Sequence, residues 1–301
     1  MKIKNIMKKA AALMLAAGLT VPLYTNSVFA EVGDEKISLG ADLSEDQKAE
    51  VLRLLDITNL DDSEVIYVTN EEEHEYLDSY VNYDKIGDTA LSSSKIILKE
   101  DGYGINVTTY NINYCTVGMY QSALATAGVK NADVYVAGPA KISGTAALVG
   151  IMKAYNTASD GTLSEENVEA ATQELAVTSE LGEAIDDPEK AEQIVAKLKE
   201  ELNNIDDMDD ASINEKITEV ASELGVSLSD SEISSIRELL RKLGSLDIDW
   251  DSLLGQLKGL YEKYTSSNSG SIDANNILNN IGNFFSGIIN KLSEFFKGLF
   301  G

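Results

Sequence analysis

The chain has one cysteine and one histidine, so any thiol–imidazole chemistry must use Cys115 and His74. A cysteine nucleophile needs a base within hydrogen-bond reach and a lowered pKa. Cys115 stands beside the expected start of a helix, which favours a thiolate, whereas His74 stands among glutamates that should raise its pKa and keep it in solvent. The pattern favours a buried cysteine and a surface histidine over a catalytic pair. A Ser–His–Asp triad would need the same histidine, and no Gly-x-Ser-x-Gly motif is present.

A loop with two glycines, residues 138–145, joins an expected strand to an expected helix. It is similar to a phosphate-binding loop, but the spacing differs by one residue and no lysine follows the second glycine. The backbone amides of residues 143–145, helped by Lys141, still form a candidate anion site at a helix start. Tight packing is the simpler role for these glycines.

Three acidic runs carry candidate calcium ligands: residues 156–167, 206–210 and 247–251. The first has Ala158 and Asn167 where a calcium loop needs a ligand and a bidentate glutamate, and the other two lack the loop's frame. Helix capping explains all three runs. We expect no cofactor, and only weak binding of divalent cations to the acidic surface. A pair of carboxylates that cleaves cell-wall polymers remains an alternative. With 50 acidic residues, however, some close pair is expected by chance, so such a pair is weak evidence for an enzyme.

The start of the chain has the pattern of a secretory signal peptide, residues 1–30. Four lysines precede an apolar run at residues 10–19, and Val28 and Ala30 occupy positions −3 and −1 of a cleavage site before Glu31. The alternative is an uncleaved anchor, but the run is short against the roughly 20 residues of a bilayer span. We expect a secreted protein, extracellular or associated with the cell wall.

The charge balance limits the partners. Cleavage after Ala30 removes four lysines and no acid, which leaves 20 basic and 50 acidic residues and shifts the formal net charge from −26 to −30. Such a surface repels nucleic acid and anionic lipid. We therefore expect no nucleic-acid partner.

Residues 31–160 are expected to form an α/β domain with the element order β-α-β-β-α-β-α after a leading helix. The expected elements are residues 44–55, 64–69, a helix from 70, 93–99, 105–110, 116–127, 132–137 and 143–155. The turn signal Asp101-Gly102 predicts that the strands at 93–99 and 105–110 form a hairpin. This order favours a split β-α-β layer with helices on one face of the sheet, with a doubly wound sheet as the alternative. Residues 31–43 are interpreted as a short, loosely held acidic arm.

Several residues mark where these helices start and stop. Ser44, Asn70, Thr116 and Ser143 are predicted N-caps, and Gly128 is a predicted left-handed C-cap. The helix at 143–155 is rich in glycine and alanine, which predicts close approach to a neighbouring element.

Strand signals stop after residue 160, and residues 161–264 are expected to form an all-α helical domain. Ser164, Asp187-Pro188 and a capping box of Ser229 and Glu232 mark three helix starts. A last helix of this domain is expected from about Asp249. A flexible Ser/Gly linker at 265–271 follows.

Residues 272–301 are expected to form a separate amphipathic apolar helix. Its apolar face is a candidate interaction face, made of Ile281, Phe284, Phe285, Ile288, Leu292, Phe295 and Phe296. A face of this size is costly to leave in water. Binding to a protein partner or self-association ranks first, membrane contact without a span second, and docking on the parent domain third.

The run from Asn111 to Tyr155 resembles the YpuA-like family of secreted Firmicute proteins of unknown function. The resemblance is carried by Thr126-Ala127-Gly128, Val136-Ala137-Gly138-Pro139 and residues 143–148, and the segment 246–249 looks like the family's helical half. It spans roughly residues 35–262, so it leaves out the phenylalanine-rich C-terminus. The resemblance implies a signal peptide and an extracytoplasmic location, and it brings no catalytic residues.

Together these patterns favour a non-enzymatic binding or assembly protein of the cell envelope or its surroundings. The alternative is a carboxylate-based hydrolase acting on cell-wall polymers. An enzyme should show clustered acids in a cleft near the strand ends around Asn70, Asn111 and Ser143, and a binding module should show a shallow surface there.

Overall fold

The computed structural model describes residues 32–61, 64–159, 161, 163–205 and 208–248. Within this part, strands and helices come first and helices alone follow, which confirms the mixed α and β class. The strands are β1 (Glu35–Gly40), β2 (Ile66–Val68), β3 (Ser93–Leu98), β4 (Ile105–Ile112) and β5 (Ala132–Ile142). The helices are α1 (Glu45–Leu54), α2 (Asn70–Leu77), α3 (Tyr83–Ile86), α4 (Val117–Ala127), α5 (Thr145–Ala158), α6 (Glu165–Ala184), α7 (Pro188–Glu200), α8 (Leu202–Ile205), α9 (Asp210–Glu223) and α10 (Asp230–Gly244).

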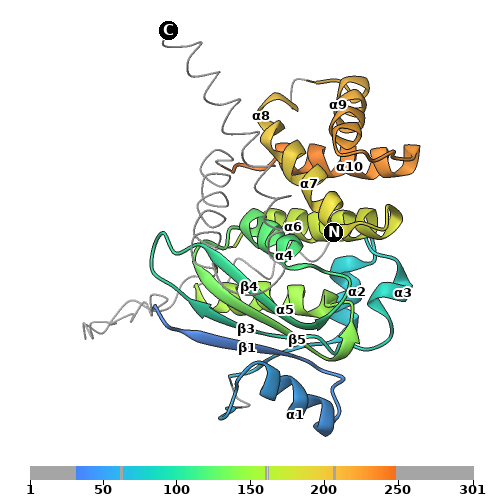
Figure 1. The fold of residues 1–301 in the computed structure, drawn as a ribbon. Coiled ribbons are helices and arrows are strands. Elements are labelled where there is room, and N and C mark those ends of the chain that lie inside the picture. The colour runs from blue at the N-terminus through green and yellow to red at the C-terminus, as the bar shows by residue number, and fades with distance from the viewer. Residues whose placement is uncertain (1–31, 62–63, 160, 162, 206–207, 249–301) are drawn as a thin grey trace, which may run out of the picture.

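The described strands form one mixed sheet in the order β2-β1-β3-β5-β4. β1 pairs with β2, and β4 with β5, in parallel; the pairs β1–β3 and β3–β5 are antiparallel. Figure 1 shows α4 and α5 on one face of the sheet and α1 on the other. The expectation of helices on one face is therefore wrong. Leu39 and Ala137 project to the second face, where α1 buries them beside Val51.

The predicted hairpin of residues 93–99 with 105–110 is also wrong. β5 lies between β3 and β4, antiparallel to the first and parallel to the second. The turn at Asp101-Gly102 exists, with a φ of 82° at Gly102, but its loop carries the chain past the end of β5. Pairing on both sides encloses β5, in which Val134 and Val136 are buried. Burial of these two side chains outweighs the local signal for a hairpin.

Residues 35–40, expected to belong to a loose arm, form β1 inside the sheet. Leu39 is fully buried against α1, and Ser38 faces α5 on the opposite side. A small polar residue at an inward position hides the strand alternation from a sequence reading. The arm interpretation is corrected by this non-local pairing.

β5 continues through Gly138-Pro139 to Ile142, where the sequence predicted the end of the strand at 137 and a loop after it. The pairing with β4 is irregular at this point: the register shifts between Tyr110 and Ile112, and Asn111 adopts a φ of 59°. The Asn111 side-chain amide donates to the Gly138 carbonyl oxygen at 3.0 Å. The proline is tolerated because it lies near the strand end, beside a bulge.

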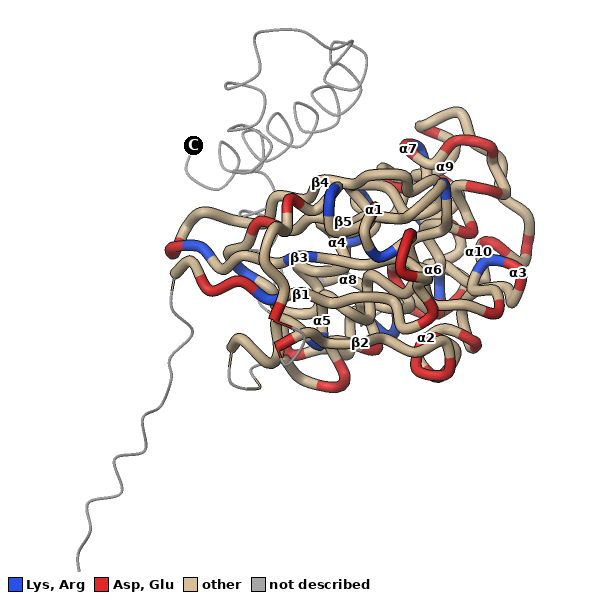
Figure 2. Tube along the Cα trace, turned by 90° about the horizontal axis from the view of Figure 1, so that it is seen from below, with Lys and Arg blue, Asp and Glu red and all other residues tan. Residues whose placement is uncertain are grey.

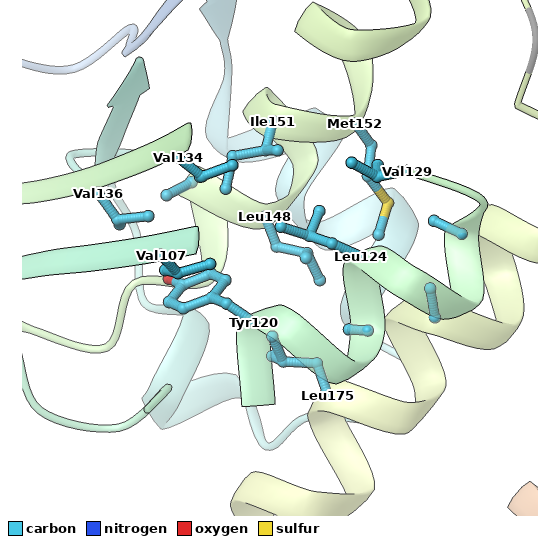
Figure 3. Close-up of a cluster of buried hydrophobic side chains, with 14 of the residues drawn as sticks. Val107, Tyr120, Leu124, Val129, Val134, Val136, Leu148, Ile151, Met152 and Leu175 are labelled. Atoms are coloured by element: carbon cyan, nitrogen blue, oxygen red, sulfur yellow. The ribbon is translucent and has the colours of Figure 1, made fainter. Parts of the chain in front are cut away.

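The main core lies between the sheet and helices α4, α5 and α6 (Figure 3). Tyr120 and Leu124 of α4 point to the same interior as Leu148 of α5 and Leu175 of α6. α4 is therefore covered on both sides, by the sheet and by α6. This explains why its sequence carries no charge.

Helix starts largely follow their local sequence. Side-chain capping is confirmed at Ser44, Thr116, Ser164, Asp187 and Ser229. Gly128 ends α4 with a φ of 100°, as predicted. The cap at Asn70 is wrong by one residue, because Thr69 caps α2 in a capping box with Glu72. Local hydrogen bonds of this kind are what a sequence reading detects best.

The close approach predicted for the glycine- and alanine-rich helix is confirmed in α5. A Cβ atom added at Gly150 would lie 2.2 Å from Ser38 Oγ of β1. Ser38 in turn shares a hydrogen bond with Ser94 of β3, with 2.6 Å between the two hydroxyl oxygens. Small residues on both elements let the helix axis approach the sheet closely.

α6 to α10 follow the sheet and form a second buried cluster with residues such as Ile194, Ile217 and Leu240. α6 contributes to both clusters: Leu175 packs in the first and Leu181 in the second. The helical half is thus tied to the α/β half along a shared helix.

The helix expected from about Asp249, the linker at 265–271 and the terminal segment 272–301 lie outside the described residues. In the described part, none of the helices has both the length and the apolar character that crossing a bilayer demands.

Candidate functional site

Glu73 is the most unusual ionisable group near the expected strand ends. It lies on α2, is only 2% exposed, and its Oε1 accepts a hydrogen bond from Thr145 Oγ1 at 2.5 Å. Its Oε2 is buried and has no hydrogen-bond partner among the described residues. An oxygen in this situation is rare in a native fold. Residues around Glu73 therefore form the candidate site.

Burial raises the pKa of Glu73 from 4.5 to about 7. The Thr145 hydroxyl and the Asn70 side chain act in the opposite direction, because they stabilise the carboxylate, but they do not offset the loss of water. A carboxyl group with this pKa holds its proton through most of the acidic range. A protonated carboxyl group can act as a proton donor, but Glu73 is only 2% exposed and has almost no contact with solvent.

The same carboxyl group occupies the candidate anion site. The Ala146 backbone and Thr145 Oγ1, at the start of α5, both interact with Glu73. Lys141 is exposed, and Ser143 is not the cap: Gly144 holds that position with a φ of 96°. The helix start that could bind an anion is thus filled by the protein's own side chain.

Cys115 is 2% exposed, and burial raises the pKa of its thiol to about 12. Hydrogen bonds to Ser179 and Tyr120 only partly oppose this shift. The expected effect of the nearby helix start, a lowered pKa, is overturned by desolvation. Tyr120 Oη also donates to the Gly144 carbonyl oxygen at 2.5 Å. The thiol is thus buried and packed against these groups.

His74 is not the solvated residue that the sequence suggested. Its side chain is 17% exposed, its Nδ1 lies 2.5 Å from Asp78 Oδ1, and its Nε2 lies 2.9 Å from the Gly87 carbonyl oxygen. The ring also stacks on Tyr83, with centroids 5.0 Å apart. Its pKa is raised, chiefly by the hydrogen bond to Asp78, and the charge of the preceding Glu73 adds a smaller effect in the same direction. Nε2 thus holds α2 against the turn after α3, and Nδ1 bonds the residue that ends α2.

A second largely buried carboxyl group lies at the start of α4. Glu192 of α7 bonds to Thr116 Oγ1, and a Cβ atom at Gly118 would lie 2.3 Å from its Oε2. Burial raises the pKa of Glu192 to about 8, with repulsion from Glu189 as the next cause, although part of the residue stays exposed. The glycine at 118 is required by this approach of the carboxyl group.

A third buried carboxyl group, Glu174, is paired. Lys199 Nζ lies 2.7 Å from Glu174 Oε1, and both side chains are at most 2% exposed. The lysine also donates to Ser122 Oγ at 3.0 Å and Thr126 Oγ1 at 2.9 Å, and both hydroxyls donate to the carboxylate. This network connects α4, α6 and α7.

The surface of the sheet beside α1 carries a smaller polar network. Asp133 of β5 accepts from Tyr103 Oη at 2.8 Å and Asn106 Nδ2 at 3.2 Å, and it pairs with Lys99 at 2.8 Å. Lys95 lies over the Tyr135 ring on the same face, 5.2 Å from its centroid. We refer to Lys95, Lys99, Tyr103, Asn106, Asp133 and Tyr135 as the Asp133 network.

The acidic runs have structural roles where they are described. Asn156 Oδ1 accepts from the Leu163 N–H at 3.2 Å, and Asp209 caps α9. Among the described residues, no group of three or more histidine, cysteine or acidic side chains could hold a metal ion. Most of the run at 247–251 lies outside the described residues.

Asn70, Asn111 and Ser143, the residues near which the sequence analysis placed a possible cleft, make hydrogen bonds to neighbouring segments. Asn70 donates to the Gly87 carbonyl oxygen at 3.0 Å, and Ser143 shares a hydrogen bond with Thr145. The acid that lies among them, Glu73, was missed because it looked like one of four glutamates in an exposed helix start. For Lys199 a signal existed: it stands four residues after Val195 on the apolar side of α7.

The chain matches a family described as "Protein of unknown function (DUF1002)" over residues 39–260. It is 41% identical over 295 residues to "Uncharacterized protein YpuA" from Bacillus subtilis (strain 168), a match that covers 97% of this chain and 100% of the relative. No solved structure matches the chain. The resemblance to the YpuA-like family is confirmed by the first two findings.

Proposed function

Because the chain belongs to the DUF1002 family, whose description assigns no function, we propose its role from the geometry: an exported protein that works by non-covalent binding or assembly in the cell envelope or outside the cell. The main support for this proposal is that the potentially reactive side chains are buried or bonded within the protein. Glu73 and Cys115 are 2% exposed, and both nitrogens of the one histidine bond inside the protein. A covalent mechanism needs such groups to reach a substrate.

Export is supported by the sequence pattern of residues 1–30. Cleavage is expected after Ala30, which makes Glu31 the first residue of the mature protein. N-terminal sequencing of secreted material tests this directly. A mature chain that starts at Met1 would refute it.

The sequence offers residues 272–301 as the main contact element. We propose that the isoleucines and phenylalanines of their apolar face meet a protein partner or a second copy, with reversible membrane contact and docking on the parent domain as the other outcomes. Deleting residues 272–301 should change both the cell association of the mature chain and its oligomeric state by light scattering. If both stay the same, this segment is not the interaction element.

The experiment that tests binding as such is crosslinking of the secreted protein on living cells. The probe is the mature chain with a photoreactive residue at Asn106, in the Asp133 network, and the matched control carries the same residue at Thr218 on the exposed side of α9. A defined crosslinked product from the first probe and not from the second supports a binding surface on the sheet. The same products from both probes contradict it.

The carboxylate-based hydrolase is kept as a second candidate because of one observation, the pKa of about 7 at Glu73. A general acid in a glycosidase has a raised pKa of this kind. The test is hydrolysis of isolated cell-wall polymer by the mature chain and by Glu73→Gln. Activity that disappears in Glu73→Gln favours the hydrolase over the binding protein.

No cofactor is part of the proposal. The acidic surface is expected to bind divalent cations weakly and without a defined site. Calorimetric titration with calcium should give weak, salt-sensitive heats, whereas a tight stoichiometric site would contradict this expectation.

A further inference from the structure

The two edges of the sheet differ in how they are protected. The β2 edge is three residues long, and Lys153 Nζ donates to the Tyr67 carbonyl oxygen at 3.2 Å. The β4 edge is eight residues long and contains no charged residue and no proline. Acidic positions outnumber basic ones along the rest of the tube in Figure 2. A long uncharged edge is what soluble proteins avoid unless something pairs with it.

The hydrogen bonds between β4 and β5 show which backbone groups of β4 point away from β5. The Gly104 carbonyl oxygen accepts from Ala132 on the β5 side, while the next carbonyl, Ile105, accepts from Gln121 Nε2 at 3.0 Å. Because successive residues of a strand alternate, the N–H and C=O groups of Val107 and Thr109 point away from β5; Val107 as a whole is 9% exposed and Thr109 is half-buried. No described strand pairs with this edge.

We propose that the β4 edge is an interface between two copies of this chain, joined by antiparallel β4–β4 pairing around a two-fold axis. In the register that uses the outward groups, Val107 of each copy pairs with Thr109 of the other, and Thr108 faces its own counterpart. The β4–β4 pairing cannot extend past two points. At one end the Ile105 carbonyl oxygen already accepts a hydrogen bond from Gln121, and at the other the bulge at Asn111 interrupts the strand.

Charges at the two ends of β4 favour this antiparallel arrangement. Glu100 and Asp101, before β4, are exposed and outnumber the exposed Lys130 at the same end, and Lys141 is exposed near the other end, one residue before Ile142, which pairs with Ile112. Antiparallel pairing brings the acidic end of one copy toward the lysine of the other. A parallel arrangement, or contact through other acidic parts of the surface, would bring like charges together.

An exposed apolar side chain adjoins the same edge. Val117 of α4 is 38% exposed and stands one helical turn before Gln121, the residue that reaches the β4 edge. Residues four apart share a helix face, so the valine lies toward the edge where the second copy would pack. The interface is small, and we expect a weak, concentration-dependent dimer.

This inference goes beyond the proposed function and does not depend on it. The test uses sedimentation velocity on the mature chain over a concentration series, with Thr108→Lys and Thr108→Glu. Thr108 is exposed, so both variants should fold. The control is Thr218→Lys, which adds the same charge on α9, far from β4 in the sequence.

The wild type and the control should dimerise alike, and each Thr108 variant alone should dimerise at least about tenfold more weakly, because like charges meet across the axis. A 1:1 mixture of the lysine and glutamate variants should restore dimers. A monomeric wild type, Thr108 variants that dimerise normally, or a mixture that stays monomeric overturns the proposal. Dimers lost only on deletion of residues 272–301 would assign the contact to that segment and overturn it as well.

Discussion

Two buried carboxyl groups in this protein are held in opposite ways. Glu174 is enclosed by α4, α6 and α7 and meets Lys199 and two hydroxyl groups, so each oxygen has a partner. Glu73 is as deeply buried, between α2 and α5, but its polar neighbours are Thr145, Asn70 and the Ala146 backbone and not a lysine, and its Oε2 has no hydrogen-bond partner among the described residues. The burial of Glu174 is thus offset by an ion pair and hydrogen bonds, whereas burial raises the pKa of Glu73 to about 7.

The comparison shows that two equally buried carboxyl groups can differ in their ion-pair and hydrogen-bond partners, and that these partners decide how well the burial is compensated. The Glu174–Lys199 pair works as a cross-link between the two halves of the protein. We expect Glu73 instead to make the junction of α2 and α5 sensitive to pH, because burial raises its pKa. The following predictions separate these roles, from the largest expected effect to the smallest.

Lys199→Met should be the most damaging change, because it leaves the Glu174 carboxylate buried without a cation. Breaking a buried pair in this way costs about 3–5 kcal/mol of unfolding free energy. Urea denaturation measures the loss. Lys197→Met is the matched control: its pair with Glu223 is partly exposed, at 2.8 Å, and should contribute roughly 0–1 kcal/mol.

The double variant Glu174→Leu with Lys199→Met should recover most of the stability lost in Lys199→Met, because it removes both charges together. If Lys199→Met is no worse than Lys197→Met, the buried pair is not the cross-link described above.

Glu73→Gln should change how the free energy of unfolding depends on pH more than it changes the magnitude of that free energy. The pKa of Glu73 is about 7 in the folded protein, against 4.5 for the unfolded reference. Between these values the folded state keeps a proton that the unfolded state has released, so stability falls as pH rises from about 4.5 to about 7 and is constant beyond. The expected fall is roughly 3 kcal/mol. Glu73→Gln should remove this slope.

Unfolding free energies at pH 5 and pH 8 measure the effect. Glu72→Gln is the control, because Glu72 is a partly exposed neighbour whose replacement should leave the Glu73 slope in place. Equal slopes in the wild type and Glu73→Gln would show that the carboxyl group is solvated in solution.

Cys115→Ser should have the smallest effect, a loss of about 1 kcal/mol, with binding to any partner intact. The thiol with a pKa of about 12 should also resist alkylation in the folded protein and react quickly after denaturation. Complete loss of activity in a folded Cys115→Ser protein, or rapid alkylation of the native chain, would contradict a structural role.

The sequence alone determined the features that depend on a few neighbouring residues. The caps at Ser44, Thr116 and Ser164, the left-handed Gly128 and the order of most elements follow from hydrogen bonds within one or two turns. The family also follows from the sequence, because its pattern of residues spans most of the chain.

The tertiary structure decided everything that joins distant segments. It placed β5 between β3 and β4, drew residues 35–40 into the sheet and put α1 on the second face. It also chose which acids lose their water: Glu73 meets Thr145 and Glu174 meets Lys199, across 72 and 25 residues of chain. The reason is that strand order and the environment of a charge are set by contacts whose partners no local pattern specifies.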